Sequence, residues 1–299
     1  MKRVEKFCLF MMVVIFATFP IIGKESQNLE KAVQVKVGNF AVPGEQQVRP
    51  LIAFGQSVVD QGIAQWFVGV IQRKGPQQNF IEVTPMYLIY GITDRFSLLL
   101  NLNIATHFES EGAVSHGLED FIIEFEYIPY IYETTKTVSA LSLVADFIVP
   151  TGSADEIPAT GYGASTFFLG FTANYLSANW YCFTSSGAIL PTSYDNNKSG
   201  NTFLYQFGVS RNIWYKTDGW IFNWMIELDG TYRQRDKVCG CIDPNSGGNS
   251  ILLGPSLWFS SRRFIAQAGI SGFIAQHLFG TQPKDSYYAA AYVGWTFKF

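Results

Sequence analysis

The sequence predicts an all-β protein, a transmembrane antiparallel β-barrel of about 12 strands that follows a cleaved signal peptide. Three observations predict this fold: alternating apolar and polar residues in many segments, an apolar run behind a basic N-terminus, and an unusual composition. The chain is 48% hydrophobic but only 15% charged, with 26 Phe, 15 Tyr and 7 Trp. Ordinary soluble domains carry roughly 25% charged residues. A barrel surrounded by lipid, with aromatic residues at both interfaces, accounts for such a composition.

The N-terminus has the pattern of a secretory signal. Lys2, Arg3 and Lys6 precede an apolar run over residues 7–22, which ends near Gly23. This run is short for a membrane-spanning helix, which needs about 20 residues. We therefore predict export and removal of a signal peptide, with an uncleaved anchor as the alternative.

The predicted organisation has three parts: a signal peptide over 1–23, a periplasmic tail or partial plug over 24–45, and the outer-membrane β-barrel over 46–299. The rest of the chain has no linker-like run of Pro, Ser or charge, which favours a single barrel domain.

The C-terminal segment predicts a strand that borders lipid. Val293, Trp295, Phe297 and the terminal Phe299 are apolar at every second position. Period-2 alternation places them on one pleat face, with polar residues on the other. The last strand of a soluble sandwich would show a similar pattern. Trp295, Phe297 and Phe299 resemble the signal by which the barrel assembly machinery of bacteria recognises its clients.

Alternation continues through most of the chain. In the segment 118–130, Phe121, Ile123 and Phe125 share one face, and Glu124 and Glu126 lie on the other. A helix, with its period of 3.6, would scatter these sets. The predicted strands are 46–56, 79–91, 95–106, 118–130, 137–150, 165–177, 179–190, 201–213, 219–232, 250–260, 263–276 and 286–299.

The connections alternate in length, as in barrels with short periplasmic turns and long outer loops. Tight joins are predicted at Gly91–Arg95, Ile131–Lys136, Leu176–Asn179, Lys216–Gly219 and Ser260–Arg262, and long joins at 57–78, 107–117, 151–164, 191–200, 233–249 and 277–285. This parity requires an even strand number. It places Gln65–Lys74, which alternates only loosely, in the first outer loop.

Prolines oppose regular pairing within the predicted strands. Pro50, Pro85, Pro129 and Pro255 each remove a backbone donor where a closed barrel has no free edge. We therefore expect bulges or strand ends at these positions.

The polar faces of the strands supply the candidate functional residues, which are lumen carboxylates. An acidic lining favours cations over anions, most strongly in a narrow pore. In a small barrel, however, inward charges also pair and fill the interior. The selectivity candidates are Glu82, Asp120, Glu124, Glu126, Asp146, Glu227 and Asp229.

Three short motifs resemble a known family. They are the run Tyr90–Phe96 (YGITDRF), the run Gly117–Asp120 (GLED) and the run Pro150–Ser153 (PTGS). Their order and spacing are similar to those of the outer-membrane family named for the MetA pathway of phenol degradation. Glu119 departs from the pattern, which has a second glycine there. The resemblance implies an outer-membrane barrel of the kind described as a transporter, and it does not identify a substrate.

Other roles remain open at this point. Loops 151–164 and 191–200, rich in Gly, Asp, Asn and Ser, suit recognition of a surface partner by a barrel without a transport role. Inward aromatic residues such as Phe168, Trp258 and Phe273 suit uptake of apolar solutes, or simple packing.

Enzymatic chemistry has little support. The only close Ser/His sets, Ser110 with His107 and Ser115 with His116, lack an orienting Asn in a lipid-facing frame. Cys239 and Cys241 suit a local disulfide or free thiols, and no further ligands with convincing spacing suggest a zinc site. We expect no catalytic activity, cofactor or metal.

These observations predict a protein of the outer membrane of a Gram-negative bacterium that passes small solutes, either cations or small apolar and aromatic compounds. Its expected partners are outer-membrane lipid, lipopolysaccharide, the barrel assembly machinery and the solutes. A net charge of −3 gives no basic surface for nucleic acid. The alternative is a surface-recognition or structural barrel with a filled lumen.

Overall fold

A computed structural model describes residues 36–299, and the predicted signal peptide and residues 24–35 lie outside this part. Two short 3-10 helices come first, and strands make up most of the rest. The elements are η1 (Gly38–Ala41), η2 (Gly44–Gln46), β1 (Ile63–Gly75), β2 (Gln78–Thr93), β3 (Phe96–Ser110), β4 (Ala113–Leu118), β5 (Phe121–Glu133), β6 (Thr137–Val149), β7 (Thr166–Ser177), β8 (Trp180–Pro191), β9 (Thr202–Lys216), β10 (Trp220–Arg233), β11 (Lys237–Val238), β12 (Cys241–Ile242), β13 (Gly248–Ser261), β14 (Phe264–Leu278) and β15 (Tyr287–Lys298).

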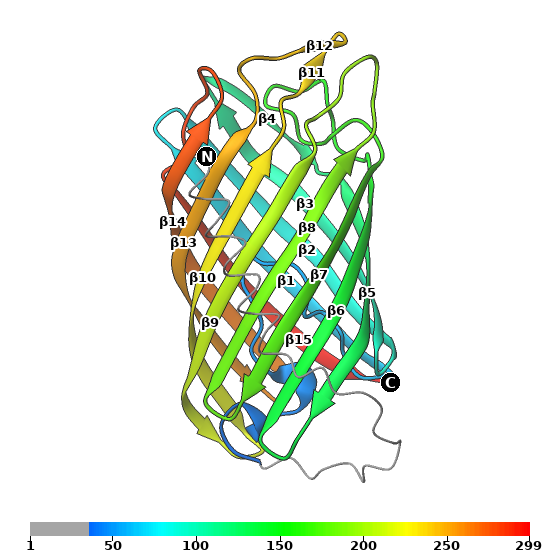
Figure 1. Ribbon diagram of the computed structural model, residues 1–299, viewed down its shortest axis with the longest axis vertical. Helices are drawn as coiled ribbons and strands as arrows, with labels where there is room; N and C mark the ends of the chain where they lie inside the picture. The colour runs from blue at the N-terminus through cyan, green and yellow to red at the C-terminus, as the bar shows by residue number, and fades with distance from the viewer. Residues whose placement is uncertain (1–35) are drawn as a thin grey trace. The chain divides into compact units, whose positions relative to one another are not determined.

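The strands close into a barrel. Neighbours along the chain pair antiparallel from β1 to β15, and β1 pairs with β15 to complete the circle (Figure 1). Setting aside β4, which extends a hairpin with β3, and the separate β11–β12 hairpin, the barrel has twelve strands. The predicted fold class and strand number are confirmed. No helix within residues 36–299 combines the length and apolarity that a membrane-spanning helix requires.

Alternation separates a lipid face from a lumen face. In β10, Ile221, Met225 and Glu227 are buried, whereas Ile226 between them is 43% exposed. The barrel strands are 12 to 16 residues long, and crossing a bilayer takes only about 9–11 tilted residues. Each strand can therefore cross the membrane and extend beyond it.

The five tight joins are all confirmed as short turns between paired strands. They lie at the same end of the barrel as η1 and the end of β15, which is the periplasmic end in this topology. Exposed aromatic residues gather near that end, including Trp180, Trp214, Tyr127 and Trp295. Such an aromatic girdle marks the boundary between lipid and water.

Two predictions about the first strands are wrong. Residues 46–56 form no strand, and Gln65–Lys74 is no outer loop but the core of β1. The join between β1 and β2 is therefore a two-residue turn, at Pro76 and Gln77. The physical reason is that the middle of β1 carries large apolar residues on both faces: Phe67 and Ile71 are buried inside, and Trp66 and Val70 are exposed outside. A strand of this kind lacks the alternation that reveals the others.

The predicted segment 118–130 is displaced as well. Residues 113–118 are β4, which folds back on β3 above the barrel, and β5 continues to Glu133. The predicted outer loop 107–117 is thus largely a β-hairpin.

Two prolines lie at irregularities, as predicted. The register between β2 and β3 shifts between Val83 and Met86, around Pro85. That between β5 and β6 shifts between Tyr127 and Tyr130, around Pro129. Pro255 lies within β13, and neither it nor Gly254 is paired with a residue of β14.

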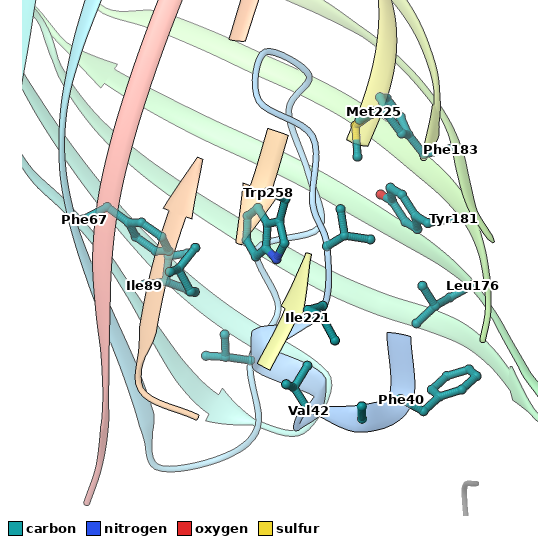
Figure 2. Packing of buried hydrophobic residues seen from close by; sticks show 14 of the residues in the cluster. Phe40, Val42, Phe67, Ile89, Leu176, Tyr181, Phe183, Ile221, Met225 and Trp258 are labelled. Atoms are coloured by element: carbon teal, nitrogen blue, oxygen red, sulfur yellow. The ribbon is translucent and has the colours of Figure 1, made fainter. Parts of the chain in front are cut away.

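Residues 36–62, here called the inner segment, run inside the barrel. Phe40, Val42, Val48 and Val59 of this segment are at most 5% exposed and pack against inward side chains of the strands. These partners include Leu99. Figure 2 shows others of them, namely Ile89, Tyr181, Phe183, Ile221, Met225 and Trp258. An apolar core therefore fills the periplasmic half of the lumen, which explains the apolar inner face of β1.

The start of the inner segment docks on the periplasmic turns. The N–H of Asn39 donates to the carbonyl of Ala178, at 2.8 Å, in the turn between β7 and β8. Gly38 has a φ of +57° and lies so close to this turn that a Cβ atom would come 1.9 Å from the same carbonyl oxygen. Only glycine fits there.

Candidate functional site in the barrel lumen

The inner segment rises from the periplasmic end to mid-lumen and returns, and lumen carboxylates hold its apex. Glu227 of β10 accepts hydrogen bonds from the backbone N–H groups of Leu51, at 2.9 Å, and Ile52, at 3.1 Å. The hydroxyl of Ser256 also donates to this carboxylate, at 3.1 Å. Glu227 is 1% exposed, so this carboxylate is occupied by the chain itself.

Glu126 of β5 holds the other side of the apex. It accepts hydrogen bonds from the N–H groups of Gln56, at 2.9 Å, and Ser57, at 2.5 Å. Between the two anchors, the N–H of Phe54 donates to Gln206 of β9, at 3.3 Å. Because these contacts come from opposite parts of the strand order, they hold the apex near the middle of the lumen.

Loop 151–164 is tied to the barrel by a third carboxylate. Asp120, which directly precedes β5, accepts hydrogen bonds from the N–H groups of Gly152, at 2.9 Å, and Tyr162, at 2.7 Å. Backbone donors that lack a sheet partner need an acceptor when they are buried. Asp120 thereby fixes this loop over the outer end of the lumen.

The remaining candidates have freer carboxylates. Glu124 and Asp146 lie directly opposite each other on β5 and β6. One oxygen of each, Oε1 of Glu124 and Oδ1 of Asp146, is buried without a hydrogen-bond partner. Asp229, 3% exposed, lies opposite Gln206 on β9.

Above the apex lies a cavity of about 600 Å³. Phe54 of the inner segment and residues of loop 151–164 line it together with side chains from the strands. Three of the predicted selectivity candidates, Glu82, Asp120 and Asp146, meet here. The lining residues are Phe54, Ile71, Arg73, Phe80, Glu82, Asn103, Phe108, Glu119, Asp120, Ile122, Asp146, Ile148, Ala159, Thr160, Gly161, Tyr162, Phe168, Ile189, Ser199, Leu204, Arg233 and Tyr288.

The two arginines of the cavity have partners. Arg233 forms an ion pair with Asp236, at 2.7 Å, and Arg73 lies 3.8 Å from Asp285. The guanidinium of Arg73 also lies over the ring of Phe80, 4.4 Å from its centroid. The arrangement is thus a cavity with apolar walls, occupied arginines and several carboxylates, which suits recognition of a small solute.

Sequence reasoning missed several of these residues. Arg73 lies in a segment whose loose alternation predicts a loop, and Phe54 lies in a segment whose alternation predicts a strand. Glu119 stood out only as a departure from the family pattern, yet it lines the cavity. The basic and aromatic residues of β1 are a sequence signal that could have identified Arg73. The contacts of the inner segment could not be predicted, because they join parts of the chain that are distant in sequence.

The other singled-out residues lie elsewhere. His107 contacts Glu109, at 3.3 Å, and the hydroxyl of Ser115 donates to the carbonyl of Pro158, at 2.5 Å. Cys239 and Cys241 are exposed free thiols in the β11–β12 hairpin. Within residues 36–299, no group of three or more His, Cys, Asp or Glu side chains converges as a metal site would require.

The side chains of Trp295, Phe297 and Phe299 are 38%, 46% and 84% exposed. The ring of Trp295 is tilted against that of Trp66 of β1, with ring centroids 5.8 Å apart. These residues therefore line the exterior beside the seam where the barrel closes. Their recognition by the assembly machinery stays a prediction.

Comparison with solved structures supports the fold. The outer membrane channel from Pseudomonas putida F1 matches with a TM-score of 0.67 and 14% identity, over 84% of this chain and 100% of that one. LpxR from Salmonella typhimurium matches with a TM-score of 0.41 and 10% identity, over 79% of this chain and 100% of that one. The CymD monoaromatic hydrocarbon channel matches with a TM-score of 0.35 and 9% identity, over 81% of this chain and 89% of that one.

Only the first of these likenesses is close enough to carry weight, and at that identity it concerns the fold. No curated protein sequence matches the chain. The fold and the lipid-facing exterior agree with the predicted location, the outer membrane.

A family model matches residues 49–276, which cover most of the barrel and the apex of the inner segment. This range also contains the three motifs that suggested the resemblance. The chain belongs to the family described as "Putative MetA-pathway of phenol degradation".

Proposed function

We propose that this protein is an outer-membrane channel that passes small solutes. The observation that carries the proposal is the cavity of about 600 Å³ between the inner segment and loop 151–164, with both apolar and charged walls. A barrel filled only for stability would pair or pack the inward groups at this level as well. Here the outer half of the lumen holds space of the size of a small-molecule site.

The inner segment is the barrier on this path. It fills the periplasmic half of the lumen together with the apolar core. Its apex is held by hydrogen bonds to Glu126 and Glu227, not by strand pairing. A solute that has entered the cavity reaches the periplasm when this apex shifts.

The test is the conductance of the refolded full-length protein in a planar lipid bilayer with a salt gradient. We expect discrete current steps and a reversal potential that indicates cation preference, because the lumen carries more unpaired carboxylates than cations. Glu124→Gln should reduce this preference, since Glu124 lies opposite Asp146 beside the cavity. Asp155→Asn, in the exposed part of loop 151–164, is the matched control and should leave selectivity unchanged.

Two outcomes would count against the proposal. If the Glu124→Gln variant had the same ion selectivity as the unaltered protein, the lumen carboxylate at this position would not determine the cation preference. Silence from protein shown to be folded would reject the channel itself.

One observation favours the second candidate, a surface-recognition barrel. Hydrogen bonds join the outer loops 191–200 and 233–249. Lys198 and Lys237 form an antiparallel β-bridge, and the N–H of Gly200 donates to the carboxylate of Asp236, at 2.7 Å. A joined pair of loops presents a fixed surface to a partner. This candidate requires that deletion of 191–200 abolish binding to a surface partner and leave permeability intact.

A further inference from the structure

We infer that the outer cavity is a binding site for an organic cation that carries an apolar or aromatic group. This inference rests on the proposed channel function and names its class of solute. It follows from the aromatic walls, from the carboxylates that lack cationic partners, and from the way the two kinds of group alternate.

Aromatic rings form two sets on the cavity wall. Phe54 and Phe168 meet edge to face, with centroids 4.6 Å apart. Phe80 and Phe108 do the same at 5.1 Å. A ring or alkyl group in the cavity gains burial against these faces, and an ammonium group is attracted to the face of an aromatic ring.

Carboxylates are interleaved with these rings. Asp146 lies opposite Glu124 on one neighbouring strand and opposite Phe168 on the other. On the far wall, Glu82 of β2 is close in sequence to Phe80, and Glu119 faces the same space. A solute with a positive centre next to an apolar body can therefore contact both kinds of group at once.

Neither arginine of the cavity wall forms an ion pair with these carboxylates. Arg233 is paired with Asp236, and Arg73 with Asp285. None of Glu82, Glu119 and Asp146 forms an ion pair within the described part of the chain. Oε1 of Glu119 and Oδ1 of Asp146 are buried without hydrogen-bond partners. Oε1 of Glu124 is also buried without a partner, and this residue is only 8% exposed.

Buried acceptors of this kind are costly unless a donor or cation meets them. An anion would add to the repulsion, and a neutral apolar solute would leave the carboxylates unmet. The acidic groups of residues 36–299 do not converge as ligands of one metal ion. Their spread along aromatic walls fits a bulky cation with distributed contacts better than a compact inorganic one.

Binding can be measured on the folded full-length protein in detergent by isothermal titration calorimetry. The probes are benzyltrimethylammonium, benzyl alcohol and benzoate, which share a ring and differ in charge, with tetramethylammonium as the cation without a ring. We expect benzyltrimethylammonium to bind at least about tenfold more tightly than any other probe, a difference of about 1.4 kcal/mol. Equal binding of benzyl alcohol, benzoate or tetramethylammonium would overturn the inference.

Variants identify the site. Asp146→Asn and Glu82→Gln should each weaken binding of benzyltrimethylammonium several-fold, and neither removes a charge that an ion pair needs. Glu133→Gln, exposed at the end of β5 far from the cavity lining, should change nothing. Folding is checked by the faster gel mobility of unheated barrels. Folded Asp146→Asn and Glu82→Gln proteins with unchanged affinity would overturn the inference.

Bilayer currents separate this inference from the proposed function. Binding of benzyltrimethylammonium without any current supports the site and contradicts the channel. Currents of inorganic ions with no preferential binding of benzyltrimethylammonium support the channel and overturn the assignment of its solute class.

Discussion

At the scale of residues, the lumen carboxylates divide into two kinds. Glu126, Glu227 and Asp120 accept backbone N–H groups from segments outside the barrel wall. Glu82 and Asp146 line the cavity, as Asp120 does, but within residues 36–299 they accept no such backbone N–H group. Alternation in the sequence predicts that these side chains point inward, because it fixes the face of each strand residue. It cannot predict which carboxylate meets a backbone donor, because those donors come from segments up to 176 residues away.

Asp120 gives a prediction at this scale. Asp120→Ala removes the acceptor for the N–H groups of Gly152 and Tyr162, and a hydrogen bond to a charged group is worth about 1.5–3 kcal/mol. We expect loop 151–164 to open and to be cut by an added protease at least several-fold faster than in the unaltered protein. Asp155→Ala, which removes an exposed carboxylate from the same loop, is the control. Equal cleavage rates in the two variants would show that Asp120 does not hold the loop.

At the scale of elements, most strands from residue 79 onward could be predicted, because each has lipid on one side and polar groups on the other. The alternation pattern does not predict β1, because the apolar residues on the inner face of this strand pack against the inner segment. Residues 46–56 resemble a strand in sequence because Val48 packs in the apolar core while the next residue, Arg49, hydrogen-bonds to Gln65 of β1. A segment between two such surfaces acquires alternation without strand pairing.

The barrel wall also uses aromatic rings that lie across glycines of the neighbouring strand. Tyr292 of β15 lies over Gly69 of β1, and Phe67 of β1 over Gly294 of β15. Tyr205 and Gly230 repeat the arrangement between β9 and β10. Two reciprocal pairs at the seam between β1 and β15 indicate that ring-on-glycine packing helps to close the barrel.

Gly69→Val tests this packing. A Cβ at residue 69 would lie 2.1 Å from the ring of Tyr292, so the ring must leave its place. Overpacking of this kind costs about 1–3 kcal/mol. We expect a lower temperature for loss of the compact gel form. Gly272→Val, where a Cβ meets nothing within 4 Å, is the matched control. If both variants lost the compact gel form at a similar temperature, the packing of the Tyr292 ring on Gly69 would not stabilise the closed barrel.

At the scale of the whole described unit, the two halves of the lumen differ in polarity and packing. The periplasmic half is an apolar core around the inner segment, and the outer half is a cavity with mixed walls. The boundary between them is the apex of the inner segment, held by two carboxylates on opposite walls. The barrier therefore depends on a few strong polar contacts above an apolar base, so the apex can move while the base stays packed.

This division predicts the effect of releasing the apex. The double variant Glu126→Ala with Glu227→Ala removes four backbone hydrogen bonds, those from Leu51, Ile52, Gln56 and Ser57. With about 1.5–3 kcal/mol for each bond to a charged group, the equilibrium between closed and displaced apex shifts by well over tenfold. We expect larger and more frequent current steps in a planar bilayer. The barrel itself should keep its compact gel form, because its strand pairing is untouched.

Two controls sharpen this experiment. Glu126→Gln with Glu227→Gln keeps one acceptor oxygen at each anchor, so its currents should lie between those of the unaltered protein and the alanine variant. Glu109→Ala with Glu111→Ala removes the same charge near the outer rim, where neither side chain contacts the inner segment, and should leave the step size unchanged. A rise in current in the rim variant as large as in the alanine variant would assign the effect to net charge. Unchanged currents in the folded alanine variant would instead show that the apolar base alone sets the barrier, because the polar anchors are then the weaker restraint on the inner segment.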